Sequence, residues 1–250
     1  MLLKQVEAYW RKRAAAYAKV NLAELSSFKK QAWLDLLAEY APVLAPGRLN
    51  ILDIGTGPGF LAILLAGCGH VVSAVDYTDA MLEQARVNAA SQQCRIDFQR
   101  MDAHKLDFAD NRFDLIVSRN LTWDLERPAE AYREWRRVLV PGGRLLNFDA
   151  NWYLHVYDPG RRQAYEQDRQ NALAANVPDH YTCTDTAAME AIARCLPLSR
   201  QTRPQWDIEQ LLAVGFTKLV MEMEIGRRVW DEAEQVNYAS TPMFMIGAVK

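Results

Sequence analysis

A glycine-rich segment that follows an apolar run has the clearest chemical meaning in this sequence. The segment ILDIGTGPGF spans Ile51–Phe60, and the apolar run LAILLA follows it from Leu61. This order predicts a strand, a tight turn and a buried helix. Gly55, Gly57 and Gly59 permit positive φ and carry no Cβ, so a ligand can lie against the backbone beside the N–H groups of a helix start. The segment therefore predicts a ligand-binding corner.

The residues around these glycines narrow the class of ligand. A dinucleotide fingerprint that starts at Gly55 requires glycine or alanine at the position that Phe60 occupies. Asp53, just before the first glycine, suits a ligand with an ammonium or sulfonium group better than it suits a pyrophosphate. The pattern DxGxGxG resembles motif I of the class I S-adenosylmethionine (SAM)-dependent methyltransferases.

Two later aspartates follow predicted strands and add ligand contacts. Asp76 ends a strand predicted at His70–Val75, and Asp102 follows one predicted at Ile96–Arg100. At the carboxyl edge of an open α/β sheet, the Asp76 carboxylate can accept both hydroxyls of a ribose. That role fits NAD as well as SAM. Asp102 helps to separate them, because it can accept from an adenine amino group while the Ala103 N–H donates to a ring nitrogen.

Strands and helices alternate along most of the chain. Further strands are predicted at Phe113–Ser118, Arg144–Ala150, Lys218–Ile225 and Met243–Val249, and helices at Asp79–Asn88, from Pro128, and at Ile208–Val214 with Asp207 as its cap. This alternation predicts a doubly wound, mostly parallel seven-stranded α/β sheet of Rossmann-like type. The last two strands have no predicted helix between them, so we expect antiparallel neighbours and an antiparallel last strand.

The same pattern divides the chain into four parts. We expect a helical lid in residues 1–45, a SAM-binding core in 46–150, an inserted cap that binds the acceptor in 151–205, and the rest of the core in 206–250. The first helix is amphipathic. It and the helix after it pack either as scaffold or as a lid over the ligand corner.

From Leu49 to about Ala150 the chain is similar to SAM-dependent methyltransferases, specifically the small-molecule, type 11-like group. The tract AYREWRRVLVPGGRLLNFD resembles that family's helix, PGG turn and fifth strand, and WDIEQLLAVGF resembles the helix before its final strands. The resemblance implies SAM as cofactor and S-adenosylhomocysteine (SAH) as product.

The resemblance also implies a role for individual residues. Asp53 and Gly55 would border the methionine part of SAM, Gly57 and Gly59 would shape the turn, Asp76 would hold the ribose, and Asp102 with Ala103 would hold the adenine. Arg119 and Asn120 would lie beside the sulfonium through backbone carbonyls, Tyr77 and Met81 would flank the adenine, and Tyr9 and Tyr17 would cover the cofactor. A core role is equally open for Met81.

Methyl transfer from a sulfonium needs alignment of the nucleophile and exclusion of water, and a general base is optional. His155 is the candidate base and Asp149 a second one, with structural roles open for both. The aromatic residues Trp123, Trp152, Tyr153 and Tyr157 are expected to wall an acceptor pocket. Asp124, Asp149 and Asp158 suggest no defined metal geometry, so we expect no metal.

Composition limits the partners. A formal net charge of −2 and the absence of a long Lys/Arg block disfavour nucleic acid. Four cysteines without a CxxC pattern suit reduced thiols in the cytoplasm, and no apolar run reaches the roughly 18 residues of a membrane span. We expect a cytoplasmic monomer or homodimer.

The hypothesis from the sequence is a SAM-dependent methyltransferase acting on a small molecule by in-line displacement. Three alternatives share the same corner: an RNA or protein methyltransferase, a non-catalytic SAM-binding protein, and, with less support, an NAD-dependent dehydrogenase. The residues after the fourth strand, Ser118–Trp123, lack the Asn/Asp-Pro-Pro-aromatic motif of enzymes that methylate nucleobase amino groups. Fold alone does not decide among the alternatives.

Overall fold

A seven-stranded sheet forms the framework of the protein. The computed structural model describes residues 2–42, 47–181 and 184–250. The strands are β1 (Asn50–Ile54), β2 (Val71–Asp76), β3 (Asp97–Arg100), β4 (Phe113–Arg119), β5 (Leu139–Asp149), β6 (Thr217–Glu222) and β7 (Phe244–Val249), in the order β3-β2-β1-β4-β5-β7-β6. The first five strands in this order, β3, β2, β1, β4 and β5, pair in parallel with their neighbours. Strand β7 is antiparallel to both β5 and β6. The predicted mostly parallel sheet with an antiparallel last strand is confirmed.

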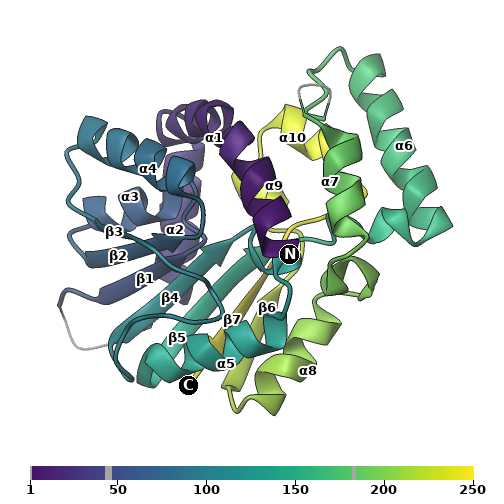
Figure 1. Ribbon diagram of the computed structural model, residues 1–250. Coiled ribbons are helices and arrows are strands. Elements are labelled where there is room, and N and C mark those ends of the chain that lie inside the picture. Colours follow the sequence, from purple (N-terminus) through teal and green to yellow (C-terminus); the bar gives the residue numbers. More distant parts are fainter. Residues whose placement is uncertain (1, 43–46, 182–183) are drawn as a thin grey trace.

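Helices cover both faces of this sheet (Figure 1). They are α1 (Leu2–Leu25), α2 (Lys29–Tyr40), α3 (Phe60–Gly67), α4 (Asp79–Ser91), α5 (Pro128–Val138), α6 (Pro159–Ala174), α7 (Thr186–Ala193), α8 (Gln205–Ala213), α9 (Gly226–Val229) and α10 (Glu232–Asn237). Ile51 belongs to a core cluster with residues of α2 and α3, while the adjacent Leu52 belongs to a second cluster with residues of α5. Successive strand residues thus feed two cores, as expected for parallel strands covered on both faces.

The first helix is placed across the carboxyl edge of the sheet. Helix α1 contacts α4 and α3 of the core and also α7, which follows β5 (Figure 1). Glu126 Oε1 accepts from Leu3 N at 2.7 Å and so holds the first turn of the helix. This position is that of a roof over the strand ends, one of the two arrangements that the sequence left open.

Two expectations about the C-terminal part were wrong. Helices α9 and α10 lie between β6 and β7, and α10 packs on α6. The signal was present, because Asp231 and Glu234 form a capping box at the start of α10. Helix α8 begins at Gln205, so Asp207 lies inside it and pairs with Arg203 instead of capping the helix.

Trp135 provides a test of the core. Its side chain is fully buried in α5 and its Nε1 donates to Ala103 O at 2.9 Å. We expect Trp135→Ala to lower the free energy of unfolding by about 3–5 kcal/mol. Trp135→Phe, which loses the hydrogen bond and less volume, should cost closer to 1 kcal/mol. Urea titrations measure both, with Leu173→Ala at an 83% exposed position as the neutral control. A Trp135→Ala cost as small as that of the control would contradict this packing.

Candidate functional site

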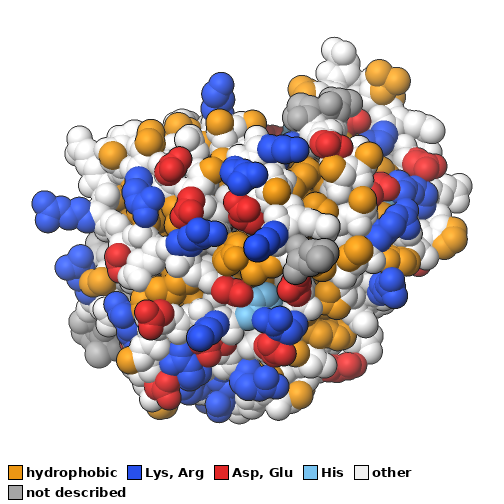
Figure 2. Space-filling view, viewed as in Figure 1, with side chains coloured by type: hydrophobic (Ala, Val, Ile, Leu, Met, Phe, Trp, Pro, Cys, Tyr) orange, Lys and Arg blue, Asp and Glu red, His pale blue; other side chains and the backbone are white. Residues whose placement is uncertain are grey.

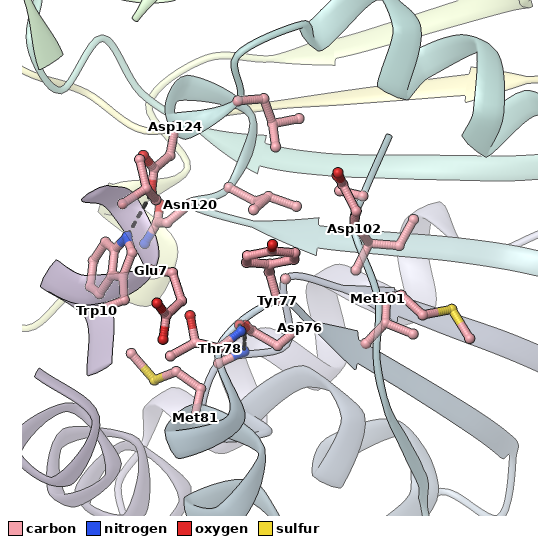
Figure 3. A pocket seen from close by; sticks show the side chains of 18 of the residues that line it. Glu7, Trp10, Asp76, Tyr77, Thr78, Met81, Met101, Asp102, Asn120 and Asp124 are labelled. Atoms are coloured by element: carbon pink, nitrogen blue, oxygen red, sulfur yellow. Dashed lines mark hydrogen bonds between the residues drawn. The ribbon is translucent and has the colours of Figure 1, made fainter. Parts of the chain in front are cut away.

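A cleft lies beneath α1 at the carboxyl ends of β1, β2 and β4. It encloses about 800 Å³, part of it open to solvent, and five segments line it: α1, the turn after β1, the start of α4, the loop after β3 and the loop after β4. Figure 3 shows Asp102 and Met101 at one end, and Asp124, Asn120 and Trp10 at the other. Ligands of open α/β sheets bind at this edge.

The glycine turn brings the backbone to the surface of the cleft. Gly55 and Gly57 have φ of +68° and +53°. A Cβ at Gly55 would lie 2.7 Å from the Leu121 side chain, and one at Gly57 would lie 3.8 Å from the Tyr17 ring. Leu121 and Tyr17 therefore close over the turn, and only glycine fits at position 55 without displacing Leu121.

Asp53 supports this turn from below. Its Oδ2 accepts from the Thr56 hydroxyl at 2.6 Å and from Ala62 N at 3.1 Å. Burial raises the pKa of Asp53 to about 6, and the two hydrogen bonds oppose that rise. The residue lines a small side pocket with Gly55 and Arg119, not the main cleft. The predicted contact with methionine stays a prediction, beside a role in holding the turn against α3.

Asp76 joins the end of β2 to the glycine turn. Its Oδ2 accepts from Gly57 N at 2.9 Å and its Oδ1 from Thr78 N at 2.8 Å. Burial raises the pKa of Asp76, whereas the donors at Thr78 and Gly57 lower it. Tyr77 and Met81 also line the cleft here. The carboxylate is thus held in one orientation.

The loop after β3 forms the end of the cleft that lies away from Asp124. Asp102 and Ala103 line the cleft with Met101. Asp102 Oδ1 accepts from His104 N at 2.9 Å and pairs with His104 Nδ1 at 2.5 Å. Since Trp135 holds Ala103 from the core side, the loop is supported on the face away from the cleft.

Arg119, at the end of β4, has a side-chain role that the sequence did not predict. The Arg119 guanidinium makes two 3.0 Å hydrogen bonds to Glu24 of α1 and lies 4.3 Å from the Phe60 ring centroid. Its side chain therefore fastens the roof helix, in addition to any role of its backbone. Asn120 has φ of +57°, in the left-handed region that asparagine adopts more readily than most other non-glycine residues.

Asp124 is the main cleft residue to which the sequence argument assigned no role, whereas its partner Trp10 belongs to the YW…Y pattern, with Tyr9 and Tyr17, of a helix expected to cover the cofactor. The Trp10 Nε1 donates to Asp124 Oδ2 at 2.6 Å across the cleft. Burial raises the pKa of Asp124 to about 8, and the Trp10 hydrogen bond opposes this. Glu7 of α1 lines the same end. A carboxylate shortly after the fourth strand was the available signal.

Several predicted residues lie outside the cleft. Tyr9 packs edge-on against Trp10 at 5.4 Å and belongs with Trp123, Trp152 and Tyr153 to an aromatic cluster shared with α7. Gly59 precedes α3, where a Cβ would lie 3.3 Å from Ala85. Tyr157 is exposed and donates to Arg194 O. The expected acceptor wall is therefore packing between the roof and the cap.

Neither candidate base reaches the cleft. His155 is buried in the cap, stacked on Tyr165 with ring centroids 4.2 Å apart, and its Nε2 lies 3.3 Å from Glu190 Oε1. Burial lowers the pKa of His155. It lines a different pocket, because the chain after β5 turns away from the cleft into α6. Asp149 is fully buried beneath the strand ends.

Arg203 organises the buried polar residues behind the cleft. It pairs with Asp149 Oδ2 and Asp207 Oδ2, each at 2.8 Å, and donates to the Thr122 hydroxyl. All three charged side chains are fully inaccessible. Because Thr122 begins the 3₁₀ turn Thr122–Asp124, this network fixes the turn that carries Asp124.

Within residues 2–42, 47–181 and 184–250, no cluster of three or more His, Cys, Asp or Glu side chains is arranged to hold a metal ion. No helix in this described part is long and apolar enough to cross a membrane.

Removing Arg203 tests the network. Arg203→Met leaves Asp149 and Asp207 buried without a cation, so the free energy of unfolding should fall by about 3–5 kcal/mol. Arg127→Met, which breaks the half-exposed pair with Glu130, should change it by at most about 1 kcal/mol. Urea titrations of both variants check this, and equal effects would refute the network's importance.

Comparisons with known proteins agree with this geometry. Residues 52–147 match the family described as a methyltransferase domain. A ubiquinone/menaquinone biosynthesis C-methyltransferase from Roseobacter denitrificans is 34% identical over 55% of this chain and 53% of the relative. A ubiquinone biosynthesis O-methyltransferase from Coxiella burnetii is 29% identical over 43% of this chain and 47% of the relative. The chain thus spans about half the length of the curated relatives it matches.

A solved structure extends the likeness to the fold. The Haemonchus contortus phosphoethanolamine N-methyltransferase 2 in complex with SAM superposes with a TM-score of 0.59 at 19% identity, over 88% of this chain and 52% of that one. This likeness shows the fold of the chain. Residues 52–147 thus match a methyltransferase domain, and the sheet order and the glycine turn with Asp76 agree with the fold of the class I SAM-dependent methyltransferases.

Proposed function

We propose that this chain transfers the methyl group of SAM to a small-molecule acceptor and releases SAH. The observation that carries this proposal is the roof over the cleft. Leu3, Val6, Glu7, Trp10 and Tyr17, all from α1, line the cleft that the strand ends form. A roofed site suits an acceptor that fits inside it, whereas a macromolecule needs an open approach to the reacting methyl.

The residues present fit SAM. The glycine turn exposes its backbone to the cleft at Gly55 and Gly57, and Asp76 and Asp102 also line the cleft, where we assign them to the ribose and the adenine. SAM supplies an activated methyl group when bound. The chain's own residues would orient the cofactor through Asp76 and the glycine turn, and exclude water through α1.

Surface charge also favours a small acceptor. On the face drawn in Figure 2, Lys and Arg side chains are interspersed with Asp and Glu rather than gathered in a basic stripe. Proteins that bind RNA or DNA backbones usually carry such a stripe. We therefore rank RNA below a metabolite as the acceptor.

The class of metabolite is the finer part of the proposal. The names of the two curated relatives refer to ubiquinone and menaquinone biosynthesis. We include quinone-related acceptors among the candidates on this basis. A cytoplasmic location belongs to the same proposal and agrees with free thiols at Cys68, Cys94 and Cys195.

Methyl-labelled SAM tests the acceptor class directly. Purified protein is incubated with labelled SAM and a cell extract that has been separated by size. Label in the small-molecule fraction is expected and supplies a product to identify. Label in RNA or protein would contradict the proposal, and SAM binding without transfer to any fraction would support a non-catalytic SAM-binding protein.

Asp76→Asn tests the cofactor site. We expect the Kd for SAH to rise roughly ten- to a hundredfold, because hydrogen bonds to a charged group contribute about 1.5–3 kcal/mol each. Asp79→Asn is the matched control, since Asp79 follows closely in sequence and its exposed side chain pairs with Arg100. Titration calorimetry measures both, and an unchanged Kd in Asp76→Asn would remove the ribose assignment.

A further inference from the structure

Two hydrogen-bond acceptors without partners lie at one end of the cleft. Asp124 is 7% exposed, and its Oδ1 has no hydrogen-bond partner in the part of the chain that the structure describes. The Oδ1 of Asn120 is also buried without a hydrogen-bond partner in the described residues. Both residues line the cleft, and Figure 3 shows them together at the end away from Asp102. Buried polar atoms in folded proteins are nearly always paired, so this end is suited to a ligand that donates hydrogen bonds.

The orientation of Asp124 is set by the chain itself. Trp10 Nε1 occupies Oδ2 at 2.6 Å, and the turn that carries Asp124 is held by Thr122 in the Arg203 network. Asp149 provides a contrast within the same fold. Arg203, Thr122 and Trp123 N all donate to Asp149 Oδ2, while Ala150 N and Trp152 donate to its Oδ1. Asp149 is therefore fully occupied, and Asp124 is not.

We propose that Asp124 contacts the methyl acceptor through Oδ1 and takes the proton of its hydroxyl group, which makes the acceptor a phenol-class molecule. Asn120 accepts a second hydrogen bond from the same molecule. This inference rests on the proposed function, because it names the acceptor chemistry of the same cleft.

The chemical step balances without a further reactant. The acceptor O–H bond breaks and its proton goes to Asp124 Oδ1, which becomes a neutral carboxylic acid. The oxygen electron pair forms the new bond to the methyl carbon. The bond between that carbon and sulfur breaks, and its electron pair stays on sulfur, so the sulfonium becomes the neutral thioether of SAH.

A phenol suits this carboxylate for two reasons. Leu3, Val6 and Leu125 contribute apolar side chains to the lining of the cleft, against which an aromatic ring can pack. Burial raises the pKa of Asp124 to about 8, whereas an ordinary phenol such as tyrosine has a pKa near 10. Proton transfer between groups of similar pKa is efficient. A neutral amine already carries a free electron pair and needs no base before it attacks.

Other charged and titratable groups act on Asp124. Asp149 and Asp76 raise its pKa, and the Trp10 hydrogen bond lowers it. The groups that face it from the surrounding elements are Glu7 and Tyr9 of α1, Asp76 of β2, Asp149 of β5 with its partner Arg203, and Tyr153. Arg203 is paired with Asp149 and Asp207, and Arg119, which also lines the cleft, is paired with Glu24.

The experiment compares two probes of the same shape, p-cresol with a hydroxyl and p-toluidine with an amine. The Asp124→Asn protein keeps an oxygen for Trp10 to donate to, so it should bind SAH as the wild type does. We expect its kcat/KM for p-cresol to fall by about 10²- to 10⁴-fold, with a much smaller change for p-toluidine. Asp114→Asn, at the opposite end of β4, is the control for both probes.

The pH profile separates proton transfer from a structural effect. Wild-type kcat/KM for p-cresol should rise with pH up to an inflection at about pH 8, because only the ionised carboxylate accepts the proton. Asp124→Asn should lose this inflection. Trp10→Phe should move it to higher pH, since the Trp10 N–H stabilises the ionised form.

Three results would overturn the inference. They are equal loss for both probes, an unchanged pH profile in Asp124→Asn, and methylation of p-toluidine alone by the wild type. A wild type that binds SAH but methylates neither probe overturns the phenolic assignment. A wild type that does not bind SAH instead refutes the proposed function.

A stability measurement tests the ionisation of Asp124 without any acceptor. The pKa of Asp124 is higher in the folded protein than in the unfolded chain, so stability is fully present below the unfolded pKa and is lost as pH rises through the folded pKa. The urea midpoint of Asp124→Asn should therefore rise relative to the midpoint of the wild type as the pH increases from about 5 to about 9. A constant difference across that range would contradict a buried titrating carboxylate.

Discussion

Buried carboxylates at the carboxyl edge of the sheet are the constraint on which the rest of this structure depends. Strands β1, β2 and β5 bring Asp53, Asp76 and Asp149 to this edge, and each needs donors once it leaves water. The Thr56 hydroxyl and Ala62 N of α3 supply them for Asp53, Gly57 N and Thr78 N supply them for Asp76, and Arg203 supplies them for Asp149. The turn that forms the cofactor cradle and the network behind it thus have one physical cause, the desolvation of these charges.

The roof helix is held by contacts that all reach the same edge. Arg119 at the end of β4 binds Glu24, Trp10 donates to Asp124, and Glu126 accepts from Leu3 N. These contacts lie along the length of α1, so the helix is fastened at its first turn, its middle and its last turn. Because the same contacts involve residues that line the cleft, cofactor binding and the position of α1 are coupled through them.

The two ends of the cleft differ in how their polar groups are satisfied. At the Asp102 end and at Asp76, the chain provides partners from its own backbone. At the Asp124 end, acceptor atoms of Asp124 and Asn120 are left without partners among the described residues. A site that accepts hydrogen bonds but donates few selects molecules that carry a proton to give.

The sequence by itself determined the features that depend on neighbours along the chain. Apolar runs that alternate between strand and helix patterns predicted the sheet. The glycine spacing, with Asp76 and Asp102, predicted a ligand site at the carboxyl edge of the sheet, because the ends of parallel strands meet there. Only the tertiary structure decided the rest. Trp10 and Asp124 are 114 positions apart, and nothing local indicates that they meet. His155 and Trp152 follow β5 closely, yet the cap turns them into packing contacts, since large aromatic side chains gain more from burial than from lining a cleft.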